Sequence, residues 1–204
     1  MNAQTVRQTI AGPAGALECA IDAPGEPPRG TAVVCHPHPQ HGGTMDNKVA
    51  QTLARAFVQL GYRAVRFNVR GVGGSQGGWD EGRGEVDDAL AVVQAFREPG
   101  RPLVLAGFSF GGYVAAAAAR RLPDDARATQ LVLVAPAVVN FPVDTVPSDT
   151  LVFHGEADDV VPLSAALDWA RPQTLPITVL PGVGHFFHGQ LALLKQLIVR
   201  SWPH

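Results

Sequence analysis

The sequence predicts an α/β fold with one mostly parallel sheet and helices on both of its faces. From residue 31 onward, short apolar runs alternate with longer segments of helical period, which is typical of this class. Runs such as Thr31–Cys35 are apolar at nearly every position, as in parallel strands buried on both faces. The 204 residues, 46% of them hydrophobic, suffice for one substantial core. Residues 1–204 are therefore predicted to form a single domain.

Turn residues and hydrophobic period locate the elements. The segments Thr5–Ile10 and Ala16–Ile21 flank a Gly/Pro turn and are expected to form an antiparallel N-terminal hairpin. Later strands are expected at Thr31–Cys35, Arg63–Val69, Leu103–Ala106, Leu131–Val134, Thr150–His154 and Ile177–Leu180. Helices are expected at Lys48–Leu60, Glu85–Phe96, the alanine-rich segment after residue 110, Ser164–Ala170 and about Gly189 to Val199.

Two helices carry end signals. Asp46 or Asn47 is expected to cap the first, since both side chains accept hydrogen bonds from free N–H groups. Glu85, Asp87 and Asp88 begin the second, where the helix dipole favours negative charge. These three acids are expected to be solvated.

The most informative stretch is Gly107-Phe108-Ser109-Phe110-Gly111, between an apolar strand and an alanine-rich helix. A strand that turns into a helix through G-x-S-x-G is a nucleophile elbow. Glycine on either side of the serine leaves room for the strand and helix to cross closely. The Ser109 hydroxyl is then expected above the sheet, at the positive end of a helix dipole. The alternative is a glycine-rich turn that holds an ordinary serine.

Carboxylates follow the expected strand Thr150–His154, at the edge where parallel sheets bind ligands. Asp158 is the candidate acid because it stands four residues before the proline of a D-x-V-V-P-like turn, which is the usual position of the acid in folds of this kind. Asp159 is the alternative, and Glu156 is less favoured. The chain order Ser, then acid, then His is the order that a nucleophile elbow requires.

The candidate base is His185, which follows a glycine in the loop after the last expected strand. A loop histidine of this kind can reach both a serine and a carboxylate. His188 lies closer to the final helix and is the alternative. Together with Ser109 and Asp158, His185 completes a predicted catalytic triad.

Two backbone N–H groups are expected to form an oxyanion hole. One belongs to Phe110, directly after the nucleophile, and the other to the loop after strand Thr31–Cys35. Pro37 and Pro39 have no N–H, so His38 is the nearest free donor in that loop beyond its first residue. The alternative is a rigid loop whose polar groups have no catalytic role.

The same loop suggests a rival chemistry. His36, His38 and His41 are spaced as in the H-x-H-x-D-H zinc motif of metallo-hydrolases. Gln40 replaces the acid of that motif, and the two prolines restrict the backbone. The serine mechanism is favoured, and we expect neither a metal nor another cofactor.

These motifs resemble those of the α/β-hydrolase superfamily over nearly the whole chain. Three further blocks are similar to small, lidless bacterial hydrolases related to dienelactone hydrolases and short-chain carboxylesterases: His36-Pro-His-Pro-Gln-His-Gly-Gly-Thr-Met-Asp-Asn-Lys48, Phe67-Asn-Val-Arg-Gly-Val-Gly-Gly-Ser75 and Gly184-His-Phe-Phe-His-Gly189. Dienelactone hydrolase uses a cysteine nucleophile, whereas this chain has Ser109, which favours ordinary esters. Only about 15 residues, Ala135–Asp149, occupy the position where related hydrolases insert a lid.

The resemblance implies a carboxylesterase-type serine hydrolase that acts on small-molecule esters with short acyl groups. A thioesterase, lactonase or peptidase would use the same triad. A non-catalytic binding module is a remote alternative, because such modules usually lose a triad member.

Composition limits the partners. A net charge of −2 without a basic stripe argues against nucleic acid and against an anionic membrane. Cys19 and Cys35 lie in apolar segments and are expected to be free core residues. No signal peptide or membrane span is recognised, so a cytoplasmic protein is expected. No particular oligomeric state is predicted.

Overall fold

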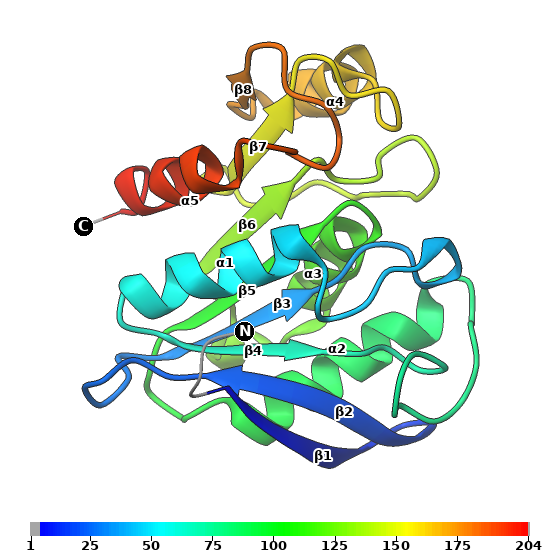
Figure 1. Cartoon of the computed structure of the whole chain (residues 1–204), viewed down its shortest axis with the longest axis vertical. Coiled ribbons are helices and arrows are strands. Elements are labelled where there is room, and N and C mark those ends of the chain that lie inside the picture. The colour runs from blue at the N-terminus through cyan, green and yellow to red at the C-terminus, as the bar shows by residue number, and fades with distance from the viewer. Residues whose placement is uncertain (1–4, 204) are drawn as a thin grey trace.

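A computed structural model describes residues 5–203, which form an eight-stranded sheet with helices on both sides (Figure 1). Residues 1–4 and 204 lie outside the described residues. Both belong to the predicted domain, and residues 1–4 belong to the N-terminal segment in which no signal peptide is expected. The strands are β1 Val6–Gly12, β2 Gly15–Asp22, β3 Thr31–Cys35, β4 Arg63–Phe67, β5 Leu103–Phe108, β6 Gln130–Val134, β7 Leu151–Gly155 and β8 Thr178–Leu180. The helices are α1 Lys48–Gln59, α2 Arg83–Phe96, α3 Phe110–Arg121, α4 Leu163–Ala170 and α5 Leu191–Arg200.

The strand order is β1-β2-β4-β3-β5-β6-β7-β8. β2 pairs antiparallel with β1 and β4, and every later pair in this order is parallel. The prediction of a mostly parallel sheet with an antiparallel N-terminal hairpin is therefore confirmed. Chain connections leave the central β3–β5 pair in opposite directions, and a crevice at the carboxyl ends of such strands is the usual ligand site.

The core has two layers because successive strand residues face opposite sides of the sheet. On β3, Ala32 and Val34 face α1 and α5, whereas Val33 and Cys35 belong to the cluster with α2, α3 and α4. Figure 1 shows α1 and α5 on one face and α3 on the other. Burial on both faces explains why this strand is apolar at four of its five positions.

The prediction that the acids of α2 are solvated is wrong for Glu85 and Asp88, which are fully buried. Glu85 accepts hydrogen bonds from the N–H groups of Asp80 and Gly82. Asp88 pairs with Arg70 at 2.8 Å. Both carboxylates therefore hold the preceding loop, and burial is tolerated because each is fully partnered.

Local signals explain other element ends. Asn47, one of the two expected caps, accepts hydrogen bonds from the N–H groups of Val49 and Ala50 at the start of α1.

Between β6 and β7, residues 135–150 form turns and bends. None of the helices formed by residues 5–203 has the length and apolar character that crossing a bilayer requires.

Candidate active site

Ser109 lies at the sharp turn between β5 and α3, at the carboxyl edge of the sheet. Its φ of 55° and ψ of −119° are unusual for a residue with a side chain, a conformation that costs about 1–3 kcal/mol. The surrounding backbone holds this turn: the N–H of Ser109 donates to Val134, and its carbonyl accepts from Gly112. The predicted nucleophile elbow is thus present in the backbone.

The flanking glycines permit the close approach that brings the turn to the centre of the sheet. A Cβ at Gly107 would collide with the carbonyl of Gly111, where the strand crosses its own helix. A Cβ at Gly111 would collide with the carbonyl of Cys35, at the end of β3. Gly111 therefore lets the start of α3 lie against the loop after β3, where the second predicted oxyanion donor stands.

Two loops carry the acid and the histidine, and they are hydrogen-bonded to each other. The loop after β7 donates from the N–H of Ala157 to the carbonyl of Val183, 3.0 Å away. Glu156 accepts in turn from the N–H of Gly182 at 2.9 Å. These two hydrogen bonds fix the spacing between the loops, and neither of them involves a side chain of the predicted triad.

The structure brings all three predicted triad side chains together. Nε2 of His185 lies 3.0 Å from Oγ of Ser109, and Nδ1 of His185 lies 2.7 Å from Oδ2 of Asp158. Nδ1–H donates to the carboxylate, so Nε2 is free to accept the serine proton. The three residues are 8%, 3% and 6% exposed for Ser109, His185 and Asp158, so little water competes for these bonds.

Asp158 is held in its charged form. Burial by itself raises the pKa of a carboxyl, but here the hydrogen bonds from His185 and from the N–H groups of Val160 and Val161 outweigh it. The resulting pKa lies below the ordinary value of Asp. Asp159, the alternative acid, is exposed, and His188, the alternative base, is exposed as well.

The side chains of the two residues predicted to supply the oxyanion donors are in contact. The rings of His38 and Phe110 have centroids 5.2 Å apart, and the ring of Trp79 packs against both, 4.7 and 5.3 Å away. Within residues 5–203, neither backbone N–H of His38 or Phe110 has a hydrogen-bond acceptor. Both N–H groups are therefore available to a ligand.

The position of Trp79 depends on residues that sequence reasoning missed. The loop that carries Trp79 is fixed at one end by the Arg70–Asp88 pair and at the other by Glu85. Helical spacing offered a signal, since Glu85, Asp88 and Val92 recur at intervals of three and four on the buried side of α2. The partner Arg70 lies outside the helix, and no local pattern indicates it.

Comparisons with known proteins agree with this geometry. The family described as "Serine aminopeptidase, S33" matches residues 26–147, more than half of the chain. An α/β serine hydrolase homologue from Coxiella burnetii is 40% identical in sequence, with a TM-score of 0.87 over 97% of both chains. The chain belongs to this family of α/β serine hydrolases.

Two further relatives fit this assignment. XC6422 from Xanthomonas campestris, described as an α/β serine hydrolase without a lid, is 38% identical to this hydrolase. The match covers 98% of this chain and 94% of that one, with a TM-score of 0.87. The uncharacterized protein RP471 of Rickettsia prowazekii is 39% identical over 116 residues, which are 55% of this chain and 49% of that protein. This hydrolase thus matches about half the length of that relative.

The histidines of the rival zinc motif serve different contacts in this hydrolase. His36 is buried: its Nδ1–H donates to the carbonyl of Pro37, and its Nε2 accepts from the N–H of Val69. His38 and His41 instead stack on each other at 4.7 Å. No cluster of three potential metal ligands is found among residues 5–203.

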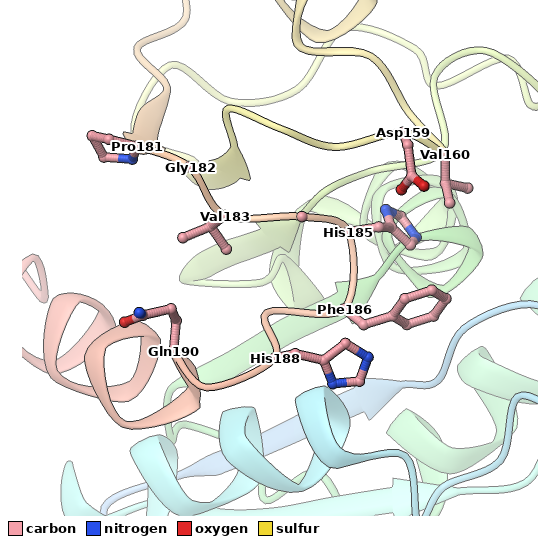
Figure 2. A pocket seen from close by; sticks show the side chains of 10 residues that line it. Asp159, Val160, Pro181, Gly182, Val183, His185, Phe186, His188 and Gln190 are labelled. Atoms are coloured by element: carbon pink, nitrogen blue, oxygen red, sulfur yellow. The ribbon is translucent and has the colours of Figure 1, made fainter.

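A pocket of ≈ 360 Å³ opens beside His185 (Figure 2). Its walls come from the loop of residues 181–190 and from Asp159 and Val160 after β7. Figure 2 shows the ring of Phe186 near His185, and the two ring centroids lie 5.1 Å apart. The pocket combines the apolar face of Phe186 with the polar groups of Asp159 and His188.

Proposed function

We propose that this hydrolase cleaves small, short-acyl carboxylic esters through an acyl-enzyme intermediate on Ser109. The observation that carries the proposal is the hydrogen-bonded chain from Ser109 through His185 to Asp158, with distances of 3.0 and 2.7 Å. The Ser109 hydroxyl is hydrogen-bonded to an imidazole, which is hydrogen-bonded to a buried carboxylate. This arrangement activates the hydroxyl to attack a carbonyl carbon.

In the acylation step, Oγ of Ser109 attacks the ester carbonyl while Nε2 of His185 takes the hydroxyl proton. The carbonyl oxygen becomes an oxyanion, which the N–H groups of Phe110 and His38 stabilise. Collapse of this intermediate breaks the bond to the alcohol oxygen, and His185 returns the proton to that leaving group. Asp158 keeps the proton on Nδ1 and stabilises the imidazolium.

Water completes the reaction. His185 takes a proton from a water molecule, whose oxygen attacks the acyl carbon and forms a second oxyanion at the same two N–H groups. Collapse breaks the bond to Oγ, and His185 returns the proton to Ser109. The acid product leaves and the enzyme is restored without a cofactor.

The choice of an ester rests on two supports. The motifs around the triad resemble those of short-chain carboxylesterases, and the triad serine with two neighbouring N–H donors is the arrangement that ester cleavage uses. Peptide cleavage is the second candidate, because the matched family is described as a serine aminopeptidase. Thioesters and lactones would be opened by the same attack.

A substrate panel tests the proposal. Wild type and Ser109→Ala are assayed with p-nitrophenyl esters, matched thioesters, lactones and amino-acid p-nitroanilides. The proposal expects the highest kcat/KM for the esters, lost in Ser109→Ala. A higher kcat/KM for the p-nitroanilides than for the esters would refute ester cleavage as the main activity and favour peptide cleavage. Activity that survives in Ser109→Ala, is lost to chelator and returns with zinc would favour the metal mechanism.

A further inference from the structure

His154, the fourth residue of β7, is a fully buried titratable group that the proposed mechanism does not use. Its Nε2 lies 2.8 Å from the carbonyl oxygen of Val161 and 3.5 Å from Oδ2 of Asp158. Because both neighbours are acceptors, Nε2 carries a proton, and burial lowers the pKa of His154, which favours the neutral form of the ring. The predicted acid therefore has a second imidazole beside it.

Packing alone does not account for a histidine at this position. With the proton on Nε2, Nδ1 keeps an unpaired acceptor, and no partner for it is found among the residues that the structure describes. A buried acceptor without a partner destabilises the fold, which an apolar side chain of similar size would avoid. The contacts that Nε2 makes offset this loss of stability.

Those contacts hold the turn that holds Asp158. The N–H of Val161 donates to Oδ1 of Asp158 at 2.7 Å, and the N–H of Val160 donates to the same oxygen at 2.9 Å. The carbonyl of Val161 accepts from His154. The Val161 backbone is thus fixed at its N–H by the carboxylate and at its carbonyl by the imidazole.

We propose that His154 is a positioning residue: it fixes the turn of residues 158–161 and thereby orients the Asp158 carboxylate toward Nδ1 of His185. The proposal rests on the proposed triad and adds a residue to it. The polar contacts of His154 are with Val161 and Asp158 and not with Ser109, so its proposed effect on the reaction passes through the Asp158 turn.

Two polar variants that differ in reach test this role. The amide of glutamine in His154→Gln extends about as far as Nε2 and can donate to Val161, whereas the amide of His154→Asn ends nearer to Nδ1. We expect His154→Asn to lower kcat by roughly ten- to a hundredfold, as the loss of an outer orienting partner does elsewhere, with KM changed less than about twofold. His154→Gln should recover most of kcat.

Val152→Ala is the matched control, because it removes buried volume from the same strand without touching Asp158. It should lower the melting temperature and leave kcat unchanged. All kcat values are expressed per site labelled by a fluorophosphonate, so partial unfolding does not imitate the expected loss. Equal kcat in His154→Gln and His154→Asn, or an equal loss in Val152→Ala, would overturn the positioning role.

The labelling rate separates this proposal from the proposed function. If the wild type hydrolyses no ester of the panel, ester cleavage fails, but the rate at which Ser109 is labelled still reports on its activation by His185. In that case, slower labelling in His154→Asn than in His154→Gln supports the positioning role, and equal rates refute it.

Discussion

Asp158 and His185 meet at 2.7 Å, although the two residues stand 27 positions apart on loops after different strands. The neighbouring Asp159 is exposed and lines the pocket beside His185. This pair of adjacent acids, one buried and one exposed, offers a matched comparison.

Asp158→Asn should lower kcat by roughly 10⁴, because an amide donor opposite Nδ1 favours the wrong tautomer of His185. Asp159→Asn should lower it less than about tenfold, since an exposed charge contributes little. Steady-state kinetics on one ester measures both. The reverse order would assign the acid to Asp159 instead.

The oxyanion hole can be tested at His38 by removing only its N–H. His38 has a φ of −54°, which proline adopts, so His38→Pro deletes the donor with little change in backbone conformation. We expect kcat to fall by roughly 10²–10³. His38→Ala removes the stacked ring but keeps the N–H, and should retain most of kcat. If both variants lose activity equally, the ring and not the N–H is what matters.

Acyl-chain length should decide activity among p-nitrophenyl esters. Each buried methylene of the acyl chain contributes about 0.8 kcal/mol of binding free energy, but only where the protein has an apolar surface that covers it. Because residues 135–150 form a loop without a helix that covers the site, kcat/KM should fall beyond roughly hexanoyl. No jump is expected when the substrate forms micelles. A value that keeps rising to palmitoyl esters contradicts this prediction.

Stability should depend on pH through His36. Burial lowers the pKa of His36 from 6.5 to about 4. Between these values the unfolded chain binds a proton that the folded chain does not, so the free energy of unfolding rises with pH, by roughly 3 kcal/mol over this range. Urea unfolding from pH 4 to 7 should show a shallower rise for His36→Asn than for the wild type. Equal slopes would mean that His36 is not buried as a neutral group.

Much of the fold was predictable from local patterns. Runs such as Thr31–Cys35 are apolar because both faces of the sheet are covered, and Asn47 caps a helix through its own side chain. The start of α2 was less predictable. Acids in a first helical turn are usually solvated, and the partner that allows Asp88 to be buried stands 18 positions earlier, at Arg70.

The candidate triad was predictable because chain order and the Gly-x-Ser-x-Gly spacing are constraints on the sequence itself. The position of Pro162 favoured Asp158, and the structure places that side chain against His185. The role inferred for His154 had no such signal. It depends on how the turn at Val161 folds back onto β7, which is a tertiary contact.

The most direct test of the central claim is the covalent labelling of Ser109. A fluorophosphonate probe is added to the wild type, Ser109→Ala and, as a control, Ser148→Ala, whose exposed serine lies in the loop after β6. Mass spectrometry then locates the adduct. We expect one adduct, on Ser109, in the wild type and Ser148→Ala, none in Ser109→Ala, and a loss of ester hydrolysis of roughly 10⁶ in that variant. An adduct elsewhere, or hydrolysis that persists in Ser109→Ala, would contradict the account.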